Sequence, residues 1–379
     1  MAGLTLHIAA PSADGGDISA RGVFERAVQE DIRREWGLTV LVTALPLRPQ
    51  PRLPWSLLEF IAALRFGWSL PIYRASSRRA IRALRRGLTT DTTLVIAHRL
   101  TTMMQLLKLR TTVPIVLDLD DIEHAKALQI PADGPSFYRR MLRWQGLRAL
   151  KAAERAACAR AVRTLVCSKV AVDYLRSEFN GEFASIPNAV NIPSRTVELS
   201  RSKVMLMVGI YSYHPNADAA QFFIREVFPI IRQKVPDAEV WFAGRGQECI
   251  APDCRDASGV KILGFQLRLD PLYAQARLAI CPIRFGGGTR IKIIEAAAFS
   301  VPCVSTTMGA EGLQFDNGES VLIGDTALDF AEQCIMVLTD HALAVHVGAA
   351  ARTTTISMYS RDAQMRALAT LFQEVQRSV

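Results

Sequence analysis

The 379-residue sequence lacks several features that mark specialised classes of protein. No stretch has low complexity and the contents of glycine (23) and proline (18) are ordinary, which argues against disordered and fibrous chains. The longest apolar run, Leu57–Leu70, is interrupted by Glu59 and Arg65 and is shorter than the roughly 20 residues of a membrane span. The first residues lack the basic and apolar segments of a signal peptide. We therefore expect a globular, cytoplasmic protein.

Cysteine pairs at metal-binding or redox spacing are also missing. The sequence has seven cysteines but no C-x-x-C pair, and most of them lie in apolar segments. They are Cys158, Cys167, Cys249, Cys254, Cys281, Cys303 and Cys334. We interpret them as reduced core residues and not as metal ligands. The histidines show no metal-ligand spacing with cysteines or carboxylates, so no metal or other cofactor is expected.

The net charge of +9 arises in residues 1–200. Arginines gather in Arg74–Arg86 and Arg139–Arg163, and the preceding segment Trp55–Trp68 supplies apolar and aromatic side chains. In the first cluster Arg78, Arg82, Arg85 and Arg86 repeat at helical spacing. This combination suits the surface of an anionic membrane, although a solvated helix beside an ordinary core explains it equally well. Nucleic acid is the least favoured partner, because no zinc module, helix-turn-helix or RNA-binding aromatic motif is present.

Apolar runs of strand length alternate with helical patterns, which predicts βαβ units and parallel sheets. The first series has strands expected at Leu4–Ala9, Leu38–Thr43, Leu94–Ala97, Ile115–Leu119, Thr164–Cys167 and Ala184–Ile186, with helices at Val23–Glu35 and Phe137–Arg163. The second has strands expected at Val204–Val208, Glu239–Ala243, Val260–Leu263, Leu278–Cys281, Cys303–Ser305 and Val321–Ile323. Because the polar stretch Pro193–Lys203 separates them, we predict Rossmann-like, doubly wound domains at 1–195 and 196–358, facing each other across a cleft. Residues 359–379 are expected to form an amphipathic helix that packs on one of them.

A glycine-rich segment follows the strand expected at Leu278–Cys281. Gly286, Gly287, Gly288 and Thr289 precede a helix expected at Ile291–Ala298. Ligands of open parallel sheets bind beyond the carboxyl ends of the strands, where backbone amides can approach a phosphate.

Charged residues surround this glycine segment. Arg284, Arg290 and Lys292 are placed to neutralise a leaving diphosphate. Glu295, about one turn further, is within reach of a ribose diol. Taken alone, a glycine turn with solvated basic residues is an equally good interpretation.

The surroundings of this loop resemble glycosyltransferase family 4, the retaining enzymes of the GT-B fold. The resemblance covers most of residues 204–325, through Val208–Gly246, Val260–Phe265, the glycine segment itself and Gly309–Leu313. The N-terminal half matches more loosely, through Gly15 and Gly16, Leu117–His124, Glu154–Ser168 and Ile186–Pro193.

The resemblance implies transfer of a hexose-type sugar from a UDP- or GDP-sugar to a hydroxyl of a carbohydrate or lipid-linked acceptor, with retention of configuration and without a metal. Polysaccharide, glycolipid or glycoconjugate synthesis is the expected setting. The donor-binding residues are expected to be Gly15, Gly16, Gly264, Phe265, Arg284, Gly286, Gly287, Gly288, Thr289, Arg290, Lys292 and Glu295. The residues expected to act in catalysis are His98, Arg290 and Lys292.

The sequence departs from this family at two positions. The family has two glutamates eight residues apart; Glu295 fits the second, but Gly287 stands at the first. The family often has Arg and Lys after the first strand of the C-terminal domain, whereas Gly209–Asn216 contains neither. Two rival hypotheses follow: a nucleotide-sugar epimerase or hydrolase on the same architecture, and a catalytically degenerate nucleotide-binding scaffold.

Acidic residues and a histidine follow two strands expected in the first half. Asp118, Asp120 and Asp121 resemble a metal-binding DxD motif, but we favour a role for Asp120 and Asp121 in orienting an acceptor or fixing the loop. His98, which Arg99 follows, is placed to reach the sugar or the acceptor. A structural role is the more common one for a lone histidine.

Overall fold

The computed structural model describes residues 7–12, 29–30, 41–46, 78–90, 92–129, 137–194 and 198–378, and every structural statement below refers to these residues. The chain divides into two compact units. Unit 1 comprises Met1–Val166, Val172–Ala184 and Val379, and unit 2 comprises Cys167–Ala171 and Ser185–Ser378. Gly15, Gly16 and Leu57–Leu70 lie outside the described residues, as does the helix expected at Val23–Glu35 apart from residues 29–30.

Unit 1 is built on parallel strands. Strands β1 (His7–Ser12) and β2 (Leu41–Pro46) form one parallel pair. A four-stranded sheet has the order β3-β4-β5-β6, with β3 Val95–His98, β4 Ile115–Asp120, β5 Arg163–Val166 and β6 Phe183–Ser185. The helices are α4 (Arg78–Gly87), α5 (Arg99–Leu109), α6 (Glu123–Gln129), α7 (Phe137–Arg160) and α8 (Lys169–Glu178). The strands and the long helix predicted for this part are thus confirmed, with ends shifted by a few residues.

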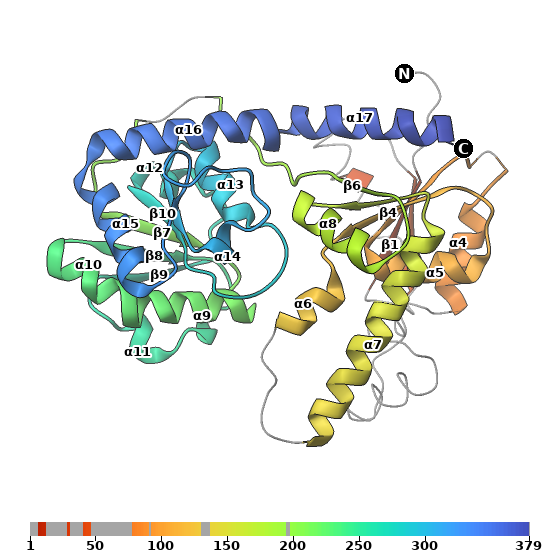
Figure 1. Cartoon of the computed structure of the whole chain (residues 1–379), viewed down its shortest axis with the longest axis horizontal. Helices are drawn as coiled ribbons and strands as arrows, with labels where there is room; N and C mark the ends of the chain where they lie inside the picture. The colour runs from red at the N-terminus through yellow and green to blue at the C-terminus, as the bar shows by residue number, and fades with distance from the viewer. Residues whose placement is uncertain are drawn as a thin grey trace. The chain divides into compact units, whose positions relative to one another are not determined.

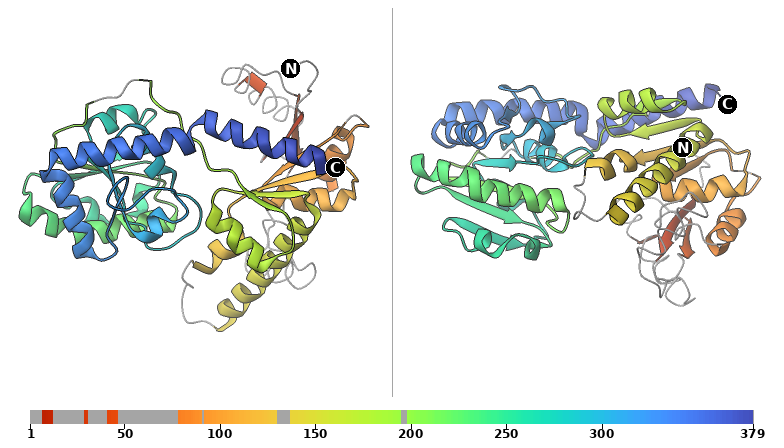
Figure 2. Two further views of the ribbon diagram at one scale, coloured as in Figure 1. Left: turned by 45° about the horizontal axis from the view of Figure 1, so that its top comes forward. Right: turned by 60° about the horizontal axis from the view of Figure 1, so that its bottom comes forward.

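Unit 2 contains a six-stranded sheet in the order β12-β11-β10-β7-β8-β9, and helices lie on both of its faces (Figures 1 and 2). The strands are β7 Val204–Val208, β8 Glu239–Ala243, β9 Val260–Gly264, β10 Leu278–Cys281, β11 Cys303–Ser305 and β12 Leu322–Ile323. The helices are α9 (His214–Phe222), the π-helix η1 (Phe223–Val227), α10 (Phe228–Lys234), the 3₁₀ helix η2 (Gln247–Cys249), α11 (Pro252–Arg255), α12 (Asp270–Gln275), α13 (Ile291–Ala298), α14 (Thr307–Ala310), α15 (Ala327–Thr339), α16 (His341–Tyr359) and α17 (Arg361–Ser378).

The order of this sheet reverses between β7 and β10. From β7 the chain proceeds outward to β8 and β9, and it then returns to β10 and proceeds outward on the other side to β11 and β12. Because neighbouring connections leave in opposite directions there, a crevice opens beyond the carboxyl ends of these two strands, and ligands of doubly wound sheets bind in such a crevice. The loops after β7 and β10 therefore mark the place where a ligand is expected.

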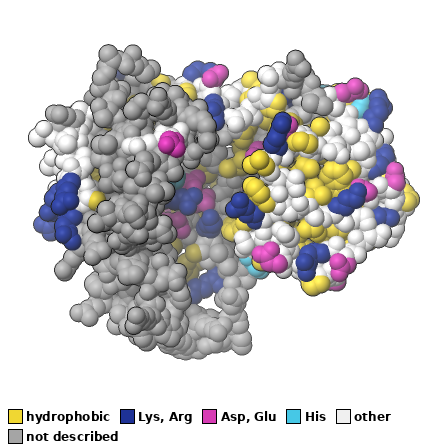
Figure 3. All heavy atoms as spheres, turned by 180° about the vertical axis from the view of Figure 1, so that it is seen from behind, with side chains coloured by type: hydrophobic (Ala, Val, Ile, Leu, Met, Phe, Trp, Pro, Cys, Tyr) yellow, Lys and Arg dark blue, Asp and Glu magenta, His cyan; other side chains and the backbone are white. Residues whose placement is uncertain are grey.

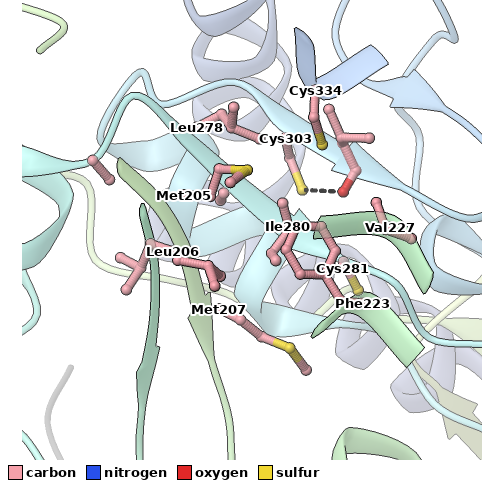
Figure 4. Close-up of a cluster of buried hydrophobic side chains, with 14 of the residues drawn as sticks. Met205, Leu206, Met207, Phe223, Val227, Leu278, Ile280, Cys281, Cys303 and Cys334 are labelled. Carbon is pink, nitrogen blue, oxygen red and sulfur yellow. Dashed lines mark hydrogen bonds between the residues drawn. The ribbon is translucent and has the colours of Figure 1, made fainter. Parts of the chain in front are cut away.

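The core of unit 2 explains why its strands could be read from the sequence. The residues of β10 are all buried, and so are the first four of β7. Strands covered on both faces give continuous apolar runs instead of alternation. Figure 4 shows Met205 and Ile280 of these strands beside Cys303, with Phe223 and Val227 of η1 packed against them.

The cysteines conform to the sequence prediction with one exception. Six of them are buried, but Cys249 is exposed. It ends the short helix η2 in the loop after β8, so the prediction of a core position is wrong for this residue. Of its apolar neighbours Ile250 and Ala251, only Ile250 is fully buried.

The face of unit 2 seen in Figure 3 carries charged side chains of both signs together with hydrophobic ones. Within the described part of the chain, no single helix is long and apolar enough to cross a membrane. Helices α15 and α16 reach the required length and composition together, but they are bent by 104° relative to one another.

Candidate functional site

The loop after β10 contains two glycines in the left-handed region of backbone conformation. We call residues 284–292 the donor loop. Gly286 has φ of +106° and Gly288 has φ of +81°, a region that favours glycine. A Cβ at Gly286 would lie 2.9 Å from Cγ of Pro215 and 2.9 Å from the hydroxyl oxygen of Tyr213. The loop therefore lies directly against the start of α9.

Arg290 lies inside the donor loop. Its two terminal nitrogens donate hydrogen bonds to the backbone carbonyls of Gly286, Gly287 and Gly288. The side chain is 8% exposed, and its Nε is buried without a hydrogen-bond partner in the described residues. A buried donor without a partner is rare, since leaving it unpaired costs about 1–3 kcal/mol. Arg290 thus holds the shape of the loop, and one of its N–H groups is left buried without a partner among the described residues.

Lys292 lies in the first turn of α13, close to the loop after β7. Its Nζ donates to Oδ1 of Asn216 over 2.7 Å. Burial lowers the pKa of this lysine from its ordinary value. The amide groups at a helix N-terminus point toward any anion bound there. The donor loop thus combines a lysine and a partly satisfied arginine at the N-terminal end of α13.

The third cation of this loop has a different arrangement. Arg284 binds the carboxylate of Asp218 on α9 through two bonds of 3.0 and 2.8 Å, and its guanidinium lies 4.5 Å above the ring of Phe222. The neighbouring rings of Phe285 and His214 are 5.3 Å apart. The side chain of Arg284 therefore contacts α9. Its predicted contact with a diphosphate stays a prediction.

Glu295 lies one turn further along α13. Within the described residues, no side chain donates a hydrogen bond to its carboxylate, and burial raises its pKa. Thr289, which directly precedes Arg290 in the loop, accepts a hydrogen bond of 2.8 Å from the side-chain amide of Asn188. Glu295 thus offers two acceptor oxygens, which is what a pair of ribose hydroxyls requires.

The loops after β8 and β9 contact one another at the same edge of the sheet. Gly244 has φ of +142°, and a Cβ there would lie 1.7 Å from the carbonyl oxygen of Gly209. Its N–H donates to the carbonyl of Gly264 over 2.7 Å. Phe265 is 57% exposed, and the guanidinium of Arg245 lies 4.2 Å above its ring. This pair presents a planar face on which a heteroaromatic base can stack.

The predicted acidic residues of unit 1 each have a basic side chain as partner. Asp118 accepts from Nδ1 of His98 over 2.9 Å, and this bond is the main reason why the pKa of His98 is raised. Asp120 pairs with Arg99 at 3.2 Å, and Asp121 pairs with Lys126 at 2.8 Å. Among the described residues no group of three or more His, Cys, Asp or Glu side chains has an arrangement that would hold a metal ion.

Two of these residues have unusual backbone geometry. Arg99 and Asp120 have φ of +65° and +64°, although neither is glycine. They follow or end the neighbouring strands β3 and β4, and their side chains form an ion pair. Such conformations cost about 1–3 kcal/mol and cluster at functional sites. The sequence placed both residues near the carboxyl edge of the sheet but gave no sign of this geometry.

A buried polar cluster behind this edge was missed. Glu154 on α7 is 0% exposed, and it accepts hydrogen bonds from both the backbone N–H and Nδ1 of His124. Nε2 of the same histidine bonds to the hydroxyl of Tyr174 over 2.8 Å. The cluster anchors α6, which follows the Asp120 and Asp121 turn. A glutamate among alanines in a helix was the available sequence signal.

Comparison of the sequence with known families gives a match within unit 2. Residues 202–340 match the family described as Glycosyl transferases group 1. A segment of 139 residues is 23% identical to an uncharacterised 44.6 kDa protein in the cps region of Klebsiella pneumoniae, covering 35% of this chain and 36% of that protein.

The fold resembles several solved structures. Sucrose-phosphate synthase from Thermosynechococcus elongatus superposes with a TM-score of 0.69 at 15% identity, over 99% of this chain and 100% of that one. HepE from Anabaena, solved with UDP and glucose, gives 0.62 at 12% identity over 97% and 99%. A TarM mutant from S. aureus, solved with fondaparinux, alpha-GlcNAc-glycerol and UDP, gives 0.63 at 15% identity. This chain covers 59% of TarM, and TarM covers 80% of this chain. The fold is GT-B.

Proposed function

We propose that this chain, whose residues 202–340 match the family Glycosyl transferases group 1 and whose fold is GT-B, transfers a sugar from a UDP-sugar to an acceptor hydroxyl with retention of configuration. One observation carries the proposal. A glycine loop at the switch point of the unit 2 sheet holds a buried arginine with an unpaired N–H beside a lysine at the start of α13. Anions bind at such a place, and a diphosphate is the anion of a nucleotide-sugar.

The donor then has a place for each of its parts. The diphosphate lies against the backbone amides of the donor loop, with Lys292 and Nε of Arg290 as cations. The ribose hydroxyls bind Glu295, and the base stacks on the pair formed by Phe265 and Arg245. Uracil is the base we favour, because UDP is bound in the HepE and TarM structures. Because Gly287 stands at the position where the resembling family has a glutamate, we expect other groups to hold the sugar.

The chemistry rests on charge and position. When the glycosidic bond to the diphosphate breaks, negative charge grows on the leaving oxygen, and prearranged cations and amides lower the energy of that state. The remaining part of the rate increase comes from holding the acceptor hydroxyl beside the anomeric carbon. We place the acceptor at the carboxyl edge of the unit 1 sheet, where His98, Asp120 and Asp121 offer donors and acceptors for sugar hydroxyls. A carbohydrate or lipid-linked acceptor in polysaccharide, glycolipid or glycoconjugate synthesis fits these groups, in the cytoplasm.

The test of this proposal is a thermal-shift and calorimetric screen of nucleotide diphosphates and their sugars. Ligand at about 100 times its dissociation constant stabilises by about 2.7 kcal/mol, so UDP should raise the melting temperature clearly. For Glu295→Gln we expect UDP affinity to fall about tenfold, since a hydrogen bond to a charged group contributes about 1.5–3 kcal/mol. The wild type should bind 2′-deoxy-UDP more weakly than UDP by a similar factor. The variant should bind the two nucleotides with equal affinity.

The exposed Glu319→Gln serves as the matched control and should bind UDP like the wild type. Equal binding of UDP and 2′-deoxy-UDP by the wild type would remove Glu295 from the ribose site. Consumption of a UDP-sugar without any acceptor product would favour the epimerase or hydrolase, and tight nucleotide binding without turnover would favour the scaffold.

We also propose that the chain attaches to an anionic membrane through the segment that ends in α4. In this helix Arg82, Arg85 and Arg86 are exposed while Ala80 and Leu84 are buried, so one face is cationic. The apolar residues of Trp55–Trp68 that would insert beside it lie outside the described residues. Each arginine near an anionic surface contributes about 1 kcal/mol, and salt screens this attraction over about 8 Å at physiological strength.

Co-sedimentation with vesicles of phosphatidylserine and phosphatidylcholine checks this attachment. Binding should require phosphatidylserine and should fall sharply as salt rises. Replacing Arg78, Arg82, Arg85 and Arg86 together with Glu should abolish it, whereas replacing the same four with Lys should preserve it because the charge is kept. If the protein shows no preference for anionic vesicles at low salt, these arginines form a solvated face.

A further inference from the structure

The donor loop packs against residues 214–218, at the start of α9. Four contacts join the two segments, and each uses a different kind of interaction. They are the ion pair of Arg284 with Asp218, the ring contact of Phe285 with His214, the close packing of Gly286 on Pro215 and the hydrogen bond of Lys292 with Asn216. The last of these contacts involves a cation that we assign to the diphosphate.

Asn216 uses both ends of its side-chain amide. Its Nδ2 donates to the carbonyl oxygen of Ile210 over 2.9 Å, and its Oδ1 accepts from Nζ of Lys292 over 2.7 Å. A carbonyl can only accept and an ammonium can only donate, so these two partners determine which way the amide points. Asn216 is 9% exposed, and it therefore connects the loop after β7 to the start of α13 from a buried position.

Gly209 leaves the space in which this connection forms. A Cβ at that position would lie 3.1 Å from Nδ2 of Asn216 and 3.3 Å from Nζ of Lys292. Distances of this size are tighter than ordinary contacts, so even an alanine would press on the pair. The segment Gly209–Asn216 contains no lysine or arginine, and the ammonium that approaches its backbone comes from α13 instead.

We propose that Asn216 is a positioning residue, which holds the ammonium of Lys292 at the donor loop while leaving its positive charge uncompensated for the diphosphate. A carboxylate in the same place would hold the lysine equally well, but it would cancel the charge that an incoming anion needs. A neutral amide supplies the hydrogen bond without that cancellation. This inference rests on the proposed function, because it concerns the donor site of that reaction.

The surroundings of Lys292 make this arrangement measurable through pH. Burial lowers the pKa of the lysine, and the charge of Arg290 acts in the same direction, while Glu295, Cys281 and Cys303 oppose it. An anion binds the protonated lysine, so affinity is constant below the pKa of Lys292 and falls as pH rises through it. Because the pKa is lowered, the fall begins at a lower pH than for an exposed lysine.

Two substitutions at this position should move the pH profile in opposite directions. Asn216→Asp adds a negative charge beside the ammonium, which raises the pKa of Lys292 and moves the fall in affinity to higher pH. Asn216→Ala removes an acceptor for the charged form, which moves the fall to lower pH. Isothermal titration with UDP between about pH 7 and about pH 10 should also show that each variant binds about tenfold more weakly than the wild type near pH 7.

Gln221→Ala is the matched control, because Gln221 lies on the same helix and its side chain bonds to the carbonyl of Ala217. It should change neither the affinity nor the profile. Amine-reactive labelling of Lys292 at a series of pH values, followed by mass spectrometry, tests the inference in the absence of nucleotide. Its midpoint should rise in Asn216→Asp and fall in Asn216→Ala. Identical midpoints in all three proteins would overturn the inference, whereas a failure of the wild type to bind UDP would overturn the proposed function instead.

Discussion

Replacing Lys292 with Ala is expected to lower kcat/KM for the UDP-sugar by about 100- to 1,000-fold, the usual effect of removing one group that stabilises developing negative charge. In our proposal this ammonium meets the diphosphate as it leaves, and its charge matters most when the glycosidic bond is breaking. The measurement is the rate of UDP release in the presence of an acceptor. Most of the loss should appear in kcat, because the interaction strengthens in the transition state.

The variant should fold as well as the wild type. A lysine whose pKa is lowered by burial makes the folded state less favourable whenever it is protonated, so its removal relieves a cost. Lys261→Ala is the control, because this half-exposed lysine pairs with Glu239 on the neighbouring strand, away from the donor loop. Turnover of Lys292→Ala within about threefold of the wild type would show that the lysine does not meet the diphosphate.

The largest effect on stability is expected for Gly244→Ala. A Cβ would lie 1.7 Å from the carbonyl oxygen of Gly209, and φ of +142° is a conformation that alanine rarely adopts. Overpacking costs about 1–3 kcal/mol and a strained backbone about 1–3 kcal/mol more. We therefore expect the free energy of unfolding to fall by about 4 kcal/mol and the melting temperature by about 10 °C. Thermal denaturation followed by circular dichroism provides the measurement.

Gly318→Ala separates the two causes of this loss. Gly318 has φ of +86°, but nothing lies within 4 Å of a Cβ there. The substitution has the conformational cost without the collision, and about 1 kcal/mol is expected. Equal losses for the two variants would mean that the contact between the loops after β7 and β8 is not tight.

The strands of unit 2 could be predicted closely because strands that are buried on both faces have continuous apolar sequences. Val204–Val208 and Leu278–Cys281 are continuous apolar runs, each preceded by a basic residue and followed by glycine or proline, and the structure gives β7 and β10 those same bounds. The helix expected at Ile291–Ala298 also has its predicted ends. A local pattern was sufficient in these cases, since the residues that define each element are neighbours in sequence.

The contacts of the donor site could not be predicted in this way. The sequence showed three basic residues beside a glycine run, but not that Arg290 turns inward to the loop carbonyls or that Arg284 pairs with Asp218. Asn216 attracted no notice, because its partner lies 76 residues further along the chain. Such pairs depend on which loops the sheet order brings together. A single sequence does not reveal that order residue by residue.

The helix that begins as α9 and ends as α10 repeats its buried residues with an unusual period. Beside Ala217 and Phe222, which are also buried, the buried pairs are Pro215 with Asn216, Ala219 with Ala220, Phe223 with Ile224 and Val227 with Phe228. They recur every four residues, whereas an α-helix has 3.6 residues per turn, so an unbroken α-helix would rotate its buried stripe by about 40° at each step. The wider turn of the π-helix η1 takes up part of this rotation.

The π-helix η1 therefore changes the direction in which the buried residues point between the start and the end of this continuous helical segment. The later turns of the segment are set by the core, and its first turn is set by the donor loop. The π-turn lets both orientations exist in one continuous element. A relative with one residue fewer between His214 and Lys234 is expected to have a regular α-helix there. In such a relative, the turn that supports the donor loop would present a different side chain to the lysine of α13.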